Sequence, residues 1–366
     1  MIRAADVAIV GAGMAGASLA AEIAPHRSVL LVEAEAQPGY HSTGRSAAFW
    51  SETYGGPLIQ PLTSASESFL RDRGLLKPRG AIHVADEAGE EALAMMAAEF
   101  EDRPVALEKM DRTALERRIP GLREEWRAGL HEPSCADIDV AGLHAAYLTA
   151  ARAAGVALVA NARLRGARRK RGRWHLETAA GEFAADVLVN AAGAWADEVA
   201  VMAGEAPLGI QPYRRTIVQL RVDPPASPAL PLVVDALSRF YFKPEAGGRL
   251  WLSPHDETPC PACDCAPEEY DIALAIDRLQ RVVDWRVERV EHSWAGLRSF
   301  AKDRLPVYGF APGGRGFFWC AGQGGFGIQT APAAAKLAAA LLLGSTPEPL
   351  VAGIDPAPYL ADRFTN

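Results

Sequence analysis

A glycine-rich turn near the start of the chain constrains the fold more than any other sequence feature. Gly11, Gly13 and Gly16 in "GAGMAG" have the G-x-G-x-x-G spacing, between the apolar run 6–10 and a helix-prone segment. The first glycine permits a tight turn, the second lets the backbone approach a pyrophosphate, and the third lets the helix pack on the strand. A second apolar strand over 28–33 completes a βαβ unit, whose helix N-terminus favours anions.

The end of the second strand narrows the choice of ligand. Glu33 follows Gly11 by 22 residues and can accept hydrogen bonds from a ribose. A carboxylate there would repel the additional phosphate of NADP. FAD and NAD both fit this fingerprint, so the choice between them depends on other segments.

Composition excludes several classes of function. The chain has 366 residues, enough for two connected domains, with 49% hydrophobic and 23% charged residues. A formal net charge of -7 argues against nucleic-acid binding, which needs basic surfaces. The basic run Arg165–Arg173 is the exception, and we expect it to form a solvated hairpin turn between two strands.

Targeting signals are not expected. No run reaches the eighteen or so apolar residues of a membrane helix, so we expect no integral membrane segment. Arg3 and the apolar stretch after it could suggest a signal peptide, but Asp6 interrupts the stretch and the glycine spacing explains it better. Five cysteines, an odd number, favour a reducing cytoplasmic location.

Three of the five cysteines lie close together in the sequence. Cys260, Cys263 and Cys265 in "CPACDC" could bind zinc, with His255 nearby. No second cysteine pair follows, and the surrounding prolines indicate an exposed loop. We therefore predict no metal site, with zinc as the alternative.

Three separated segments favour a flavin over a nicotinamide, because an extended flavin dinucleotide needs several loops. "HSTGRSAA" (41–48) offers hydroxyls and backbone N–H groups, and "NAAGAW" (190–195) is a small-residue strand end. "GQGGFGIQT" (322–330) precedes the last helix, whose dipole can face the pyrimidine edge of a reduced, anionic flavin.

Longer strings along nearly the whole chain are more specific than the glycine spacing. They read "AEAQPGYHSTGRSAA", "ADIDVAGLHAAYL", "VLVNAAGAW", "GIQPYRR", "FYFKPEAG", "HSWAGLRSF" and "GFFW…QGGFGIQT". With these strings the chain resembles the D-amino-acid oxidase superfamily of flavoproteins, and within it the bacterial D-arginine dehydrogenases. The resemblance implies a mixed α/β (α+β) fold with a Rossmann-like FAD-binding domain and an inserted β-rich substrate domain.

The domain limits and the cofactor site follow from the same resemblance. The FAD-binding domain is predicted to comprise 1–80, 139–205 and 295–366, and the substrate-binding domain 81–138 and 206–294. FAD is expected to be non-covalent, because covalent members have a cysteine where this chain has Phe300. The residues expected at the cofactor are Gly11, Gly13, Met14, Ala15, Gly16, Glu33, Ala34, Ser42, Thr43, Gly44, Arg45, Ser46, Ala47, Ala48, Arg163, Ala191, Ala192, Gly193, Trp195, Arg298, Gly322, Gln323, Gly324, Gly325, Phe326, Gly327, Ile328 and Gln329.

The resemblance also implies a substrate site. Arg298 matches the arginine that binds the substrate carboxylate, and Arg215 and Tyr241 match further carboxylate contacts. Tyr54 matches a lid-loop tyrosine, and Gly325 a backbone contact. Without the resemblance, these arginines would be interpreted as surface or interdomain ion pairs, and the tyrosine strand as half core.

Three positions depart from the pattern of D-arginine dehydrogenases. Phe49 replaces a histidine, Ser51 a threonine, and Ala81 the glutamate that holds a cationic substrate side chain. His83 lies on the same strand face as Ala81 if that strand is regular. Glu52, on a loop, is the nearest remaining acid that the sequence suggests.

These observations predict FAD-dependent oxidative deamination of a D-amino acid with a neutral or apolar side chain. Hydride would pass from Cα to the flavin, and oxygen or a quinone would take the electrons. The alternatives are a 2-hydroxy-acid dehydrogenase and an electron-transfer subunit. We expect a monomer or homodimer.

Overall fold

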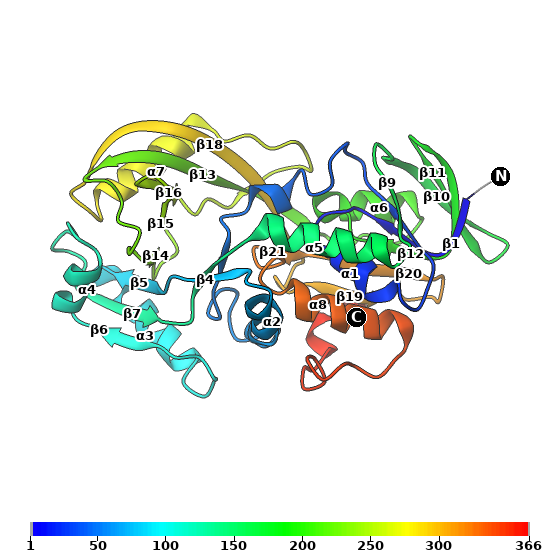
Figure 1. Cartoon of the computed structure of the whole chain (residues 1–366), viewed down its shortest axis with the longest axis horizontal. Coiled ribbons are helices and arrows are strands. Elements are labelled where there is room, and N and C mark those ends of the chain that lie inside the picture. Colours follow the sequence, from blue (N-terminus) through cyan, green and yellow to red (C-terminus); the bar gives the residue numbers. More distant parts are fainter. Residues whose placement is uncertain (1–2, 365–366) are drawn as a thin grey trace.

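The computed structural model describes residues 3–364 and shows an elongated molecule with a large β-sheet towards each end (Figure 1). One sheet has eight strands, the other ten, and a third sheet of three short strands lies near helix α2 (Gln60–Asp72). Both termini lie in the half that contains the eight-stranded sheet (Figure 1). The mixed α/β fold predicted from the sequence is confirmed.

The eight-stranded sheet contains the N-terminal βαβ unit. Its order is β10-β11-β12-β1-β2-β9, with β20 beside β12 and β19 beside β20. Residues 7–10 of β1 pack alternately into two apolar clusters, so this part of the strand is buried on both faces, as its apolar sequence requires. The strands are β1 (Arg3–Val10), β2 (Val29–Val32), β9 (Ala157–Val159), β10 (Leu164–Lys170), β11 (Arg173–Thr178), β12 (Gly181–Asn190), β19 (Val307–Phe310) and β20 (Phe317–Ala321).

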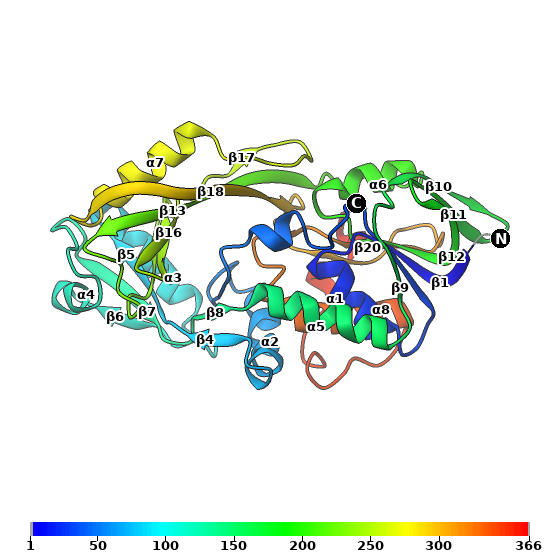
Figure 2. The ribbon, with the colours of Figure 1, turned by 45° about the horizontal axis from the view of Figure 1, so that its top comes forward.

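Helices cover both faces of this sheet, three of them on the same face. Helix α1 (Met14–Ile23) packs between α5 (Val140–Ala153) and α8 (Ala331–Leu343), as Figure 2 shows. The short helix α6 (Ala196–Met202) packs near β10 and β12. The first βα turn therefore lies close to segments from the middle and end of the chain.

The ten-stranded sheet has the order β21-β18-β13-β16-β15-β14-β5-β7-β6, with β17 beside β13. Its two longest strands, β13 and β18, run from this sheet towards the other half of the molecule (Figures 1 and 2). The strands are β5 (Ala81–Ala85), β6 (Glu108–Met110), β7 (Ala128–Glu132), β13 (Gln211–Asp223), β14 (Leu232–Asp235), β15 (Tyr241–Glu245), β16 (Arg249–Ser253), β17 (Thr258–Pro259), β18 (Arg286–Phe300) and β21 (Gln323–Gly324).

The remaining elements support these sheets. Strand β8 pairs with both β3 and β4 in the small sheet. The side chains of Asp111 and Asp139 cap their helices by accepting hydrogen bonds from Ala114 N and Gly142 N. These elements are β3 (Phe49–Trp50), β4 (Leu76–Pro78), β8 (Ala136–Ile138), α3 (Glu90–Glu99), α4 (Arg112–Arg118), α7 (Glu269–Gln280) and the 3-10 turns Ser42–Arg45, Glu87–Gly89, Gly193–Trp195, Ala357–Tyr359 and Ala361–Phe364.

One local prediction needs correction. The basic run Arg165–Arg173 is mostly strand β10 and not a turn; only Arg171 and Gly172 form the turn to β11. Arg165 and the last three residues of the strand are exposed, because β10 lies at the edge of the sheet, and this explains how it tolerates so many charges. The domain limits stay a prediction, although segments 81–138 and 206–294 do contribute most strands of the ten-stranded sheet.

Candidate active site

The first βα turn has the close backbone approach that its glycines predict. Gly11 has a positive φ of 101°, and a Cβ there would lie 2.4 Å from the carbonyl oxygen of Ala191. A Cβ on Gly16 would lie 1.8 Å from the carbonyl oxygen of Gly11. Gly11 shapes the turn against β12, and Gly16 lets helix α1 pack beneath it.

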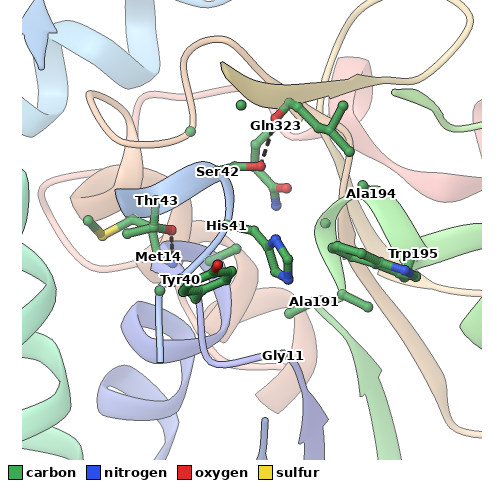
Figure 3. A pocket seen from close by; sticks show the side chains of 18 of the residues that line it. Gly11, Met14, Tyr40, His41, Ser42, Thr43, Ala191, Ala194, Trp195 and Gln323 are labelled. Carbon is green, nitrogen blue, oxygen red and sulfur yellow. Dashed lines mark hydrogen bonds between the residues drawn. The ribbon is translucent and has the colours of Figure 1, made fainter. Parts of the chain in front are cut away.

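The sequence-predicted acid and hydroxyl lie at this turn. Glu33 is buried, and its Oε2 accepts a 2.7 Å hydrogen bond from Ala12 N. Thr43 Oγ1 accepts a 3.0 Å hydrogen bond from Met14 N at the start of α1 (Figure 3). The 41–48 segment is therefore anchored directly above the helix N-terminus, as expected of a second cofactor loop.

A single pocket extends from this turn to Arg298. Its wall contains most of the residues predicted to contact the cofactor: Gly11, Gly13, Met14, Ala15, Glu33, Ala34, Ser42, Thr43, Arg45, Ser46, Ala47, Arg163, Ala191, Ala192, Gly193, Trp195, Arg298, Gln323, Gly324, Gly325, Gly327 and Ile328. Six others lie outside this wall: Gly16, Gly44, Ala48, Gly322, Phe326 and Gln329. Their contacts with a cofactor stay a prediction.

Gln329 has hydrogen-bond partners within the protein. Its Nε2 donates hydrogen bonds to the carbonyl oxygens of Ser51 and Tyr54, both at 3.1 Å. It also donates to Thr63 Oγ1 at 2.9 Å. Gln329 thus fastens the 51–54 loop to the start of α8.

Sequence reasoning missed several pocket residues. Tyr40 directly precedes the 41–48 segment and His41 is its first residue, and neither was named among the expected cofactor contacts. The His41 ring lies 4.6 Å from that of Trp195 (Figure 3). Glu35 accepts a 3.0 Å hydrogen bond from Arg163 and also contacts His41. Their only sequence signal is their position beside the glycine and hydroxyl motifs.

The cysteine loop lies against the same pocket. Arg45 binds the carboxylate of Asp264 and donates to the carbonyl oxygen of Cys265 at 2.8 Å. The sulfurs of Cys260 and Cys263 are 3.6 Å apart. Within residues 3–364, no group of three or more His, Cys, Asp or Glu side chains is arranged to hold a metal ion.

The two predicted arginines meet at the far end of the pocket. In the antiparallel pairing of β13 and β18, Arg298 lies opposite Tyr213 and Arg215 lies opposite Gly296. Paired residues share a sheet face, so both guanidinium groups project from one face of these long strands. Both residues line the pocket.

Arg298 contacts hydroxyls instead of a carboxylate. Its Nη1 is 2.7 Å from Tyr54 Oη, and its Nη2 is 3.5 Å from Tyr241 Oη. No ion pair forms to Arg298 within residues 3–364. A largely buried cation without a counter-charge favours an anionic ligand.

Arg215 and His255 complete the charge pattern at this end. Arg215 is 3% exposed and pairs with Glu257 at 3.1 Å, and its Nη1 has no hydrogen-bond partner within the described residues. Burial, and then the charge of Arg298, lowers the pKa of Arg215. Burial and the same two arginines lower the pKa of His255 well below its usual value, so this histidine is neutral at pH 7.

The three departures from D-arginine dehydrogenases lie nearby. The Phe49 ring packs against those of Tyr54 and Tyr241, at 5.3 and 5.8 Å. Ala81 is fully buried in an apolar cluster that includes Tyr241. Ser51 is buried and donates a 3.0 Å hydrogen bond to Glu132. Their contact with substrate stays a prediction.

Glu132 is the acid that sequence reasoning overlooked. It lies opposite Ala81 in the β5–β7 pair and is 0% exposed. Glu52, which the sequence suggested instead, is buried and binds Ser64 Oγ. Glu132 lies 51 residues from Ala81 along the chain (132 − 81), so only the strand pairing reveals their proximity.

These features fit a flavin dinucleotide. Gly13, the N-cap of α1, has no side-chain cap, so N–H groups of the first turn can face a pyrophosphate. The pocket is long, because its wall runs from β1 and α1 through the 41–47 segment to the 323–328 loop. A nicotinamide site would not need the last two segments.

Comparison with known proteins agrees with this fit. The family model "DAO: FAD dependent oxidoreductase" matches residues 6–341, which is most of the chain. The chain belongs to this family. Its cofactor is therefore FAD, held non-covalently, with Phe300 where covalent members have a cysteine.

Individual proteins similar to this chain match it over most of their length. Glycine oxidase of Geobacillus kaustophilus is 28% identical over 360 residues, 92% of each chain, and that of Pseudomonas putida is 28% identical over 97% of each. The crystal structure of the Geobacillus kaustophilus enzyme superposes with a TM-score of 0.83 at 26% identity, over 98% of both chains. These matches support the family and do not support the narrower resemblance to D-arginine dehydrogenases.

Two features of this chain suit such a family member. Arg298 and Tyr54 can bind a substrate carboxylate, and the neutral His255 nearby keeps the site free of a third positive charge. FAD held along the pocket wall would supply the two-electron acceptor for the substrate. No helix within residues 3–364 is long and apolar enough to cross a membrane.

Proposed function

We propose that this chain oxidises a D-amino acid with a neutral or apolar side chain at Cα. The product is an imino acid that hydrolyses to a 2-keto acid. The observation that carries the proposal is Arg298: a pocket-lining cation within reach of two tyrosine hydroxyls and without a carboxylate partner in the described part of the chain. The carboxylate of an amino acid would supply the missing charge.

Charge near the pocket favours a neutral substrate side chain. The guanidinium groups of Arg215 and Arg298 make this end of the pocket positive. They would repel the cation of a basic substrate side chain. The buried acid Glu132 already accepts hydrogen bonds from the 51–53 loop, so it is not free to bind an incoming ammonium. A long basic side chain would lose water without gaining a partner, which costs several kcal/mol.

Two alternatives follow from specific observations. Arg298 would bind the carboxylate of a 2-hydroxy acid equally well, so a 2-hydroxy-acid dehydrogenase is the second candidate. Pseudomonas aeruginosa hydrogen cyanide synthase subunit HcnC is 26% identical over 70% of this chain. An electron-transfer subunit is therefore the third candidate, although the complete Arg298 site argues against it.

Anaerobic bleaching of the bound flavin tests these candidates. Purified holoprotein would be mixed with glycine, neutral D- and L-amino acids, D-arginine, D-lysine and 2-hydroxy acids, and flavin absorbance would be followed. We expect neutral D-amino acids to give the largest kcat/KM. Fastest bleaching by D-arginine, or bleaching by 2-hydroxy acids alone, would overturn the proposal. Reoxidation by oxygen or by a quinone would then identify the acceptor.

The remaining assignments are also proposals. The partners are a small amino-acid substrate and an electron acceptor, either oxygen or a quinone. We propose a cytoplasmic location and a monomer or homodimer, both of which can be measured by fractionation and by light scattering.

A further inference from the structure

A fully buried carboxylate lies beside the loop that carries Tyr54. Glu132, the last residue of β7, is 0% exposed. Isolated buried carboxylates are costly, so such a group is retained only where hydrogen bonds and charge compensate it. The identity of its partners therefore indicates what it does.

Three of these partners belong to one short loop. Glu132 Oε1 accepts a hydrogen bond from Glu52 N at 2.6 Å. Its Oε2 accepts from Ser51 Oγ at 3.0 Å and from Thr53 Oγ1 at 2.7 Å. One carboxylate thus binds three consecutive residues of the chain.

A histidine also contacts this carboxylate. His83 Nε2 lies 3.4 Å from Glu132 Oε2 and 3.3 Å from Thr53 Oγ1. Burial would raise the pKa of Glu132, but the hydrogen bond and charge of His83, and then the two hydroxyls, lower it overall. The carboxylate is thus kept ionised and accepts from all its donors.

The residue after this loop meets the predicted carboxylate site. Tyr54 directly follows Thr53, and its hydroxyl lies 2.7 Å from Arg298 Nη1. There is little free space around this hydroxyl, since a Cβ on Gly325 would be only 2.0 Å from it. A small movement of the loop would therefore change the contact with Arg298.

We propose that Glu132, paired with His83, is a positioning residue that fixes the 51–53 loop and so holds the Tyr54 hydroxyl against Arg298. Glu132 acts through Tyr54 and does not itself touch the substrate. The inference rests on the proposed role of Arg298 as the carboxylate site. It extends that proposal by naming two further residues, Glu132 and His83, that influence substrate affinity through Tyr54.

Glu132→Gln tests the role, because glutamine keeps the shape and removes the charge. We expect KM for the best D-amino acid to rise about tenfold, with kcat changing less, since a hydrogen bond to a charged group contributes about one decade of binding. The dissociation constant of benzoate, a carboxylate that cannot be oxidised at Cα, should rise similarly, measured by the shift of the flavin spectrum.

A double-mutant cycle separates positioning from general destabilisation. In a Tyr54→Phe background the hydroxyl is absent, so Glu132→Gln should change KM by less than about twofold. Equal effects of Glu132→Gln in both backgrounds would overturn the proposal. If Glu132→Gln does not fold, Thr53→Val removes one donor to the same carboxylate and should show the same dependence on Tyr54.

A matched control lies two strands away from β7 in the same sheet. Asp235 in β14 is 1% exposed and binds Arg239, away from the loop. Asp235→Asn should lower the melting temperature without raising KM or the benzoate dissociation constant; a similar rise would mean that any buried acid has this effect.

The two proposals fail in different ways. Wild-type holoprotein that binds benzoate but oxidises no amino acid would refute the proposed function, and the benzoate cycle would still test Glu132. Holoprotein that does not bind benzoate would refute the positioning role, because no carboxylate site would exist for Tyr54 to complete.

Discussion

Arg298→Ala gives the most direct test of the substrate site. In the wild type the guanidinium lies in the pocket wall, 2.7 Å from Tyr54 Oη and 3.5 Å from Tyr241 Oη. Because no carboxylate of the described residues pairs with it, the substrate carboxylate is its expected counter-ion. Alanine would leave that carboxylate with only the tyrosine hydroxyls and Arg215 in the pocket.

The size of the effect follows from burial. Removing one partner of a buried ion pair costs about 3–5 kcal/mol, because the other charge stays desolvated and uncompensated. At about 1.4 kcal/mol per tenfold change, kcat/KM should fall by roughly two to four orders of magnitude. Arg215 remains in the mutant and can still attract the substrate carboxylate. We therefore expect a fall in kcat/KM in the lower half of this range.

Stopped-flow flavin reduction under anaerobic conditions measures this fall. The bound FAD should stay near one per chain, because most of the pocket wall lies elsewhere. Arg289→Ala is the matched control: Arg289 lies on the same strand but is 65% exposed, so its loss should change kcat/KM little. Equal kcat/KM for wild type and Arg298→Ala would show that the carboxylate binds elsewhere.

Three further predictions concern the cofactor, the lid contact and pH. Acid or heat denaturation should release yellow FAD into the supernatant; colour on the precipitate would contradict non-covalent binding. Gly325→Ala places a Cβ 2.0 Å from Tyr54 Oη, so KM should rise with FAD still bound, and an unchanged KM would show that Tyr54 is dispensable. Burial lowers the pKa of His144, so the unfolded chain binds a proton that the folded chain does not, and stability should decline as pH falls below about 6.5. His144→Gln, which can still donate to Ala12 O, should flatten this decline in thermal unfolding; an identical slope would refute the assignment.

Relations between neighbours in the sequence were predictable. The apolar run Ala81–Ala85 forms a strand, and Asp111 and Asp139 cap the helices that follow them. Gly11 adopts the positive φ that a tight turn requires. Each of these features depends on residues within a few positions, where backbone sterics and local hydrogen bonds decide the conformation.

Charge patterns were less reliable than apolar ones. The run Arg165–Arg173 resembles a solvated turn by composition, yet most of it is strand β10. An edge strand can keep alternate side chains in water, so many charges do not exclude pairing. The strand conformation of this segment depends on pairing with β11, which lies beyond the local pattern.

The sequence alone determined the dinucleotide fold, and through the resemblance the flavin family, because glycine spacing and strand–helix alternation are local properties. Only the tertiary structure decided which side chains meet. Tyr54 and Arg298 are 244 residues apart, and Glu132 lies 81 residues from Ser51. Their contacts depend on the register of β13 with β18 and of β5 with β7. Such registers are set by packing between distant segments, which no spacing within one segment encodes.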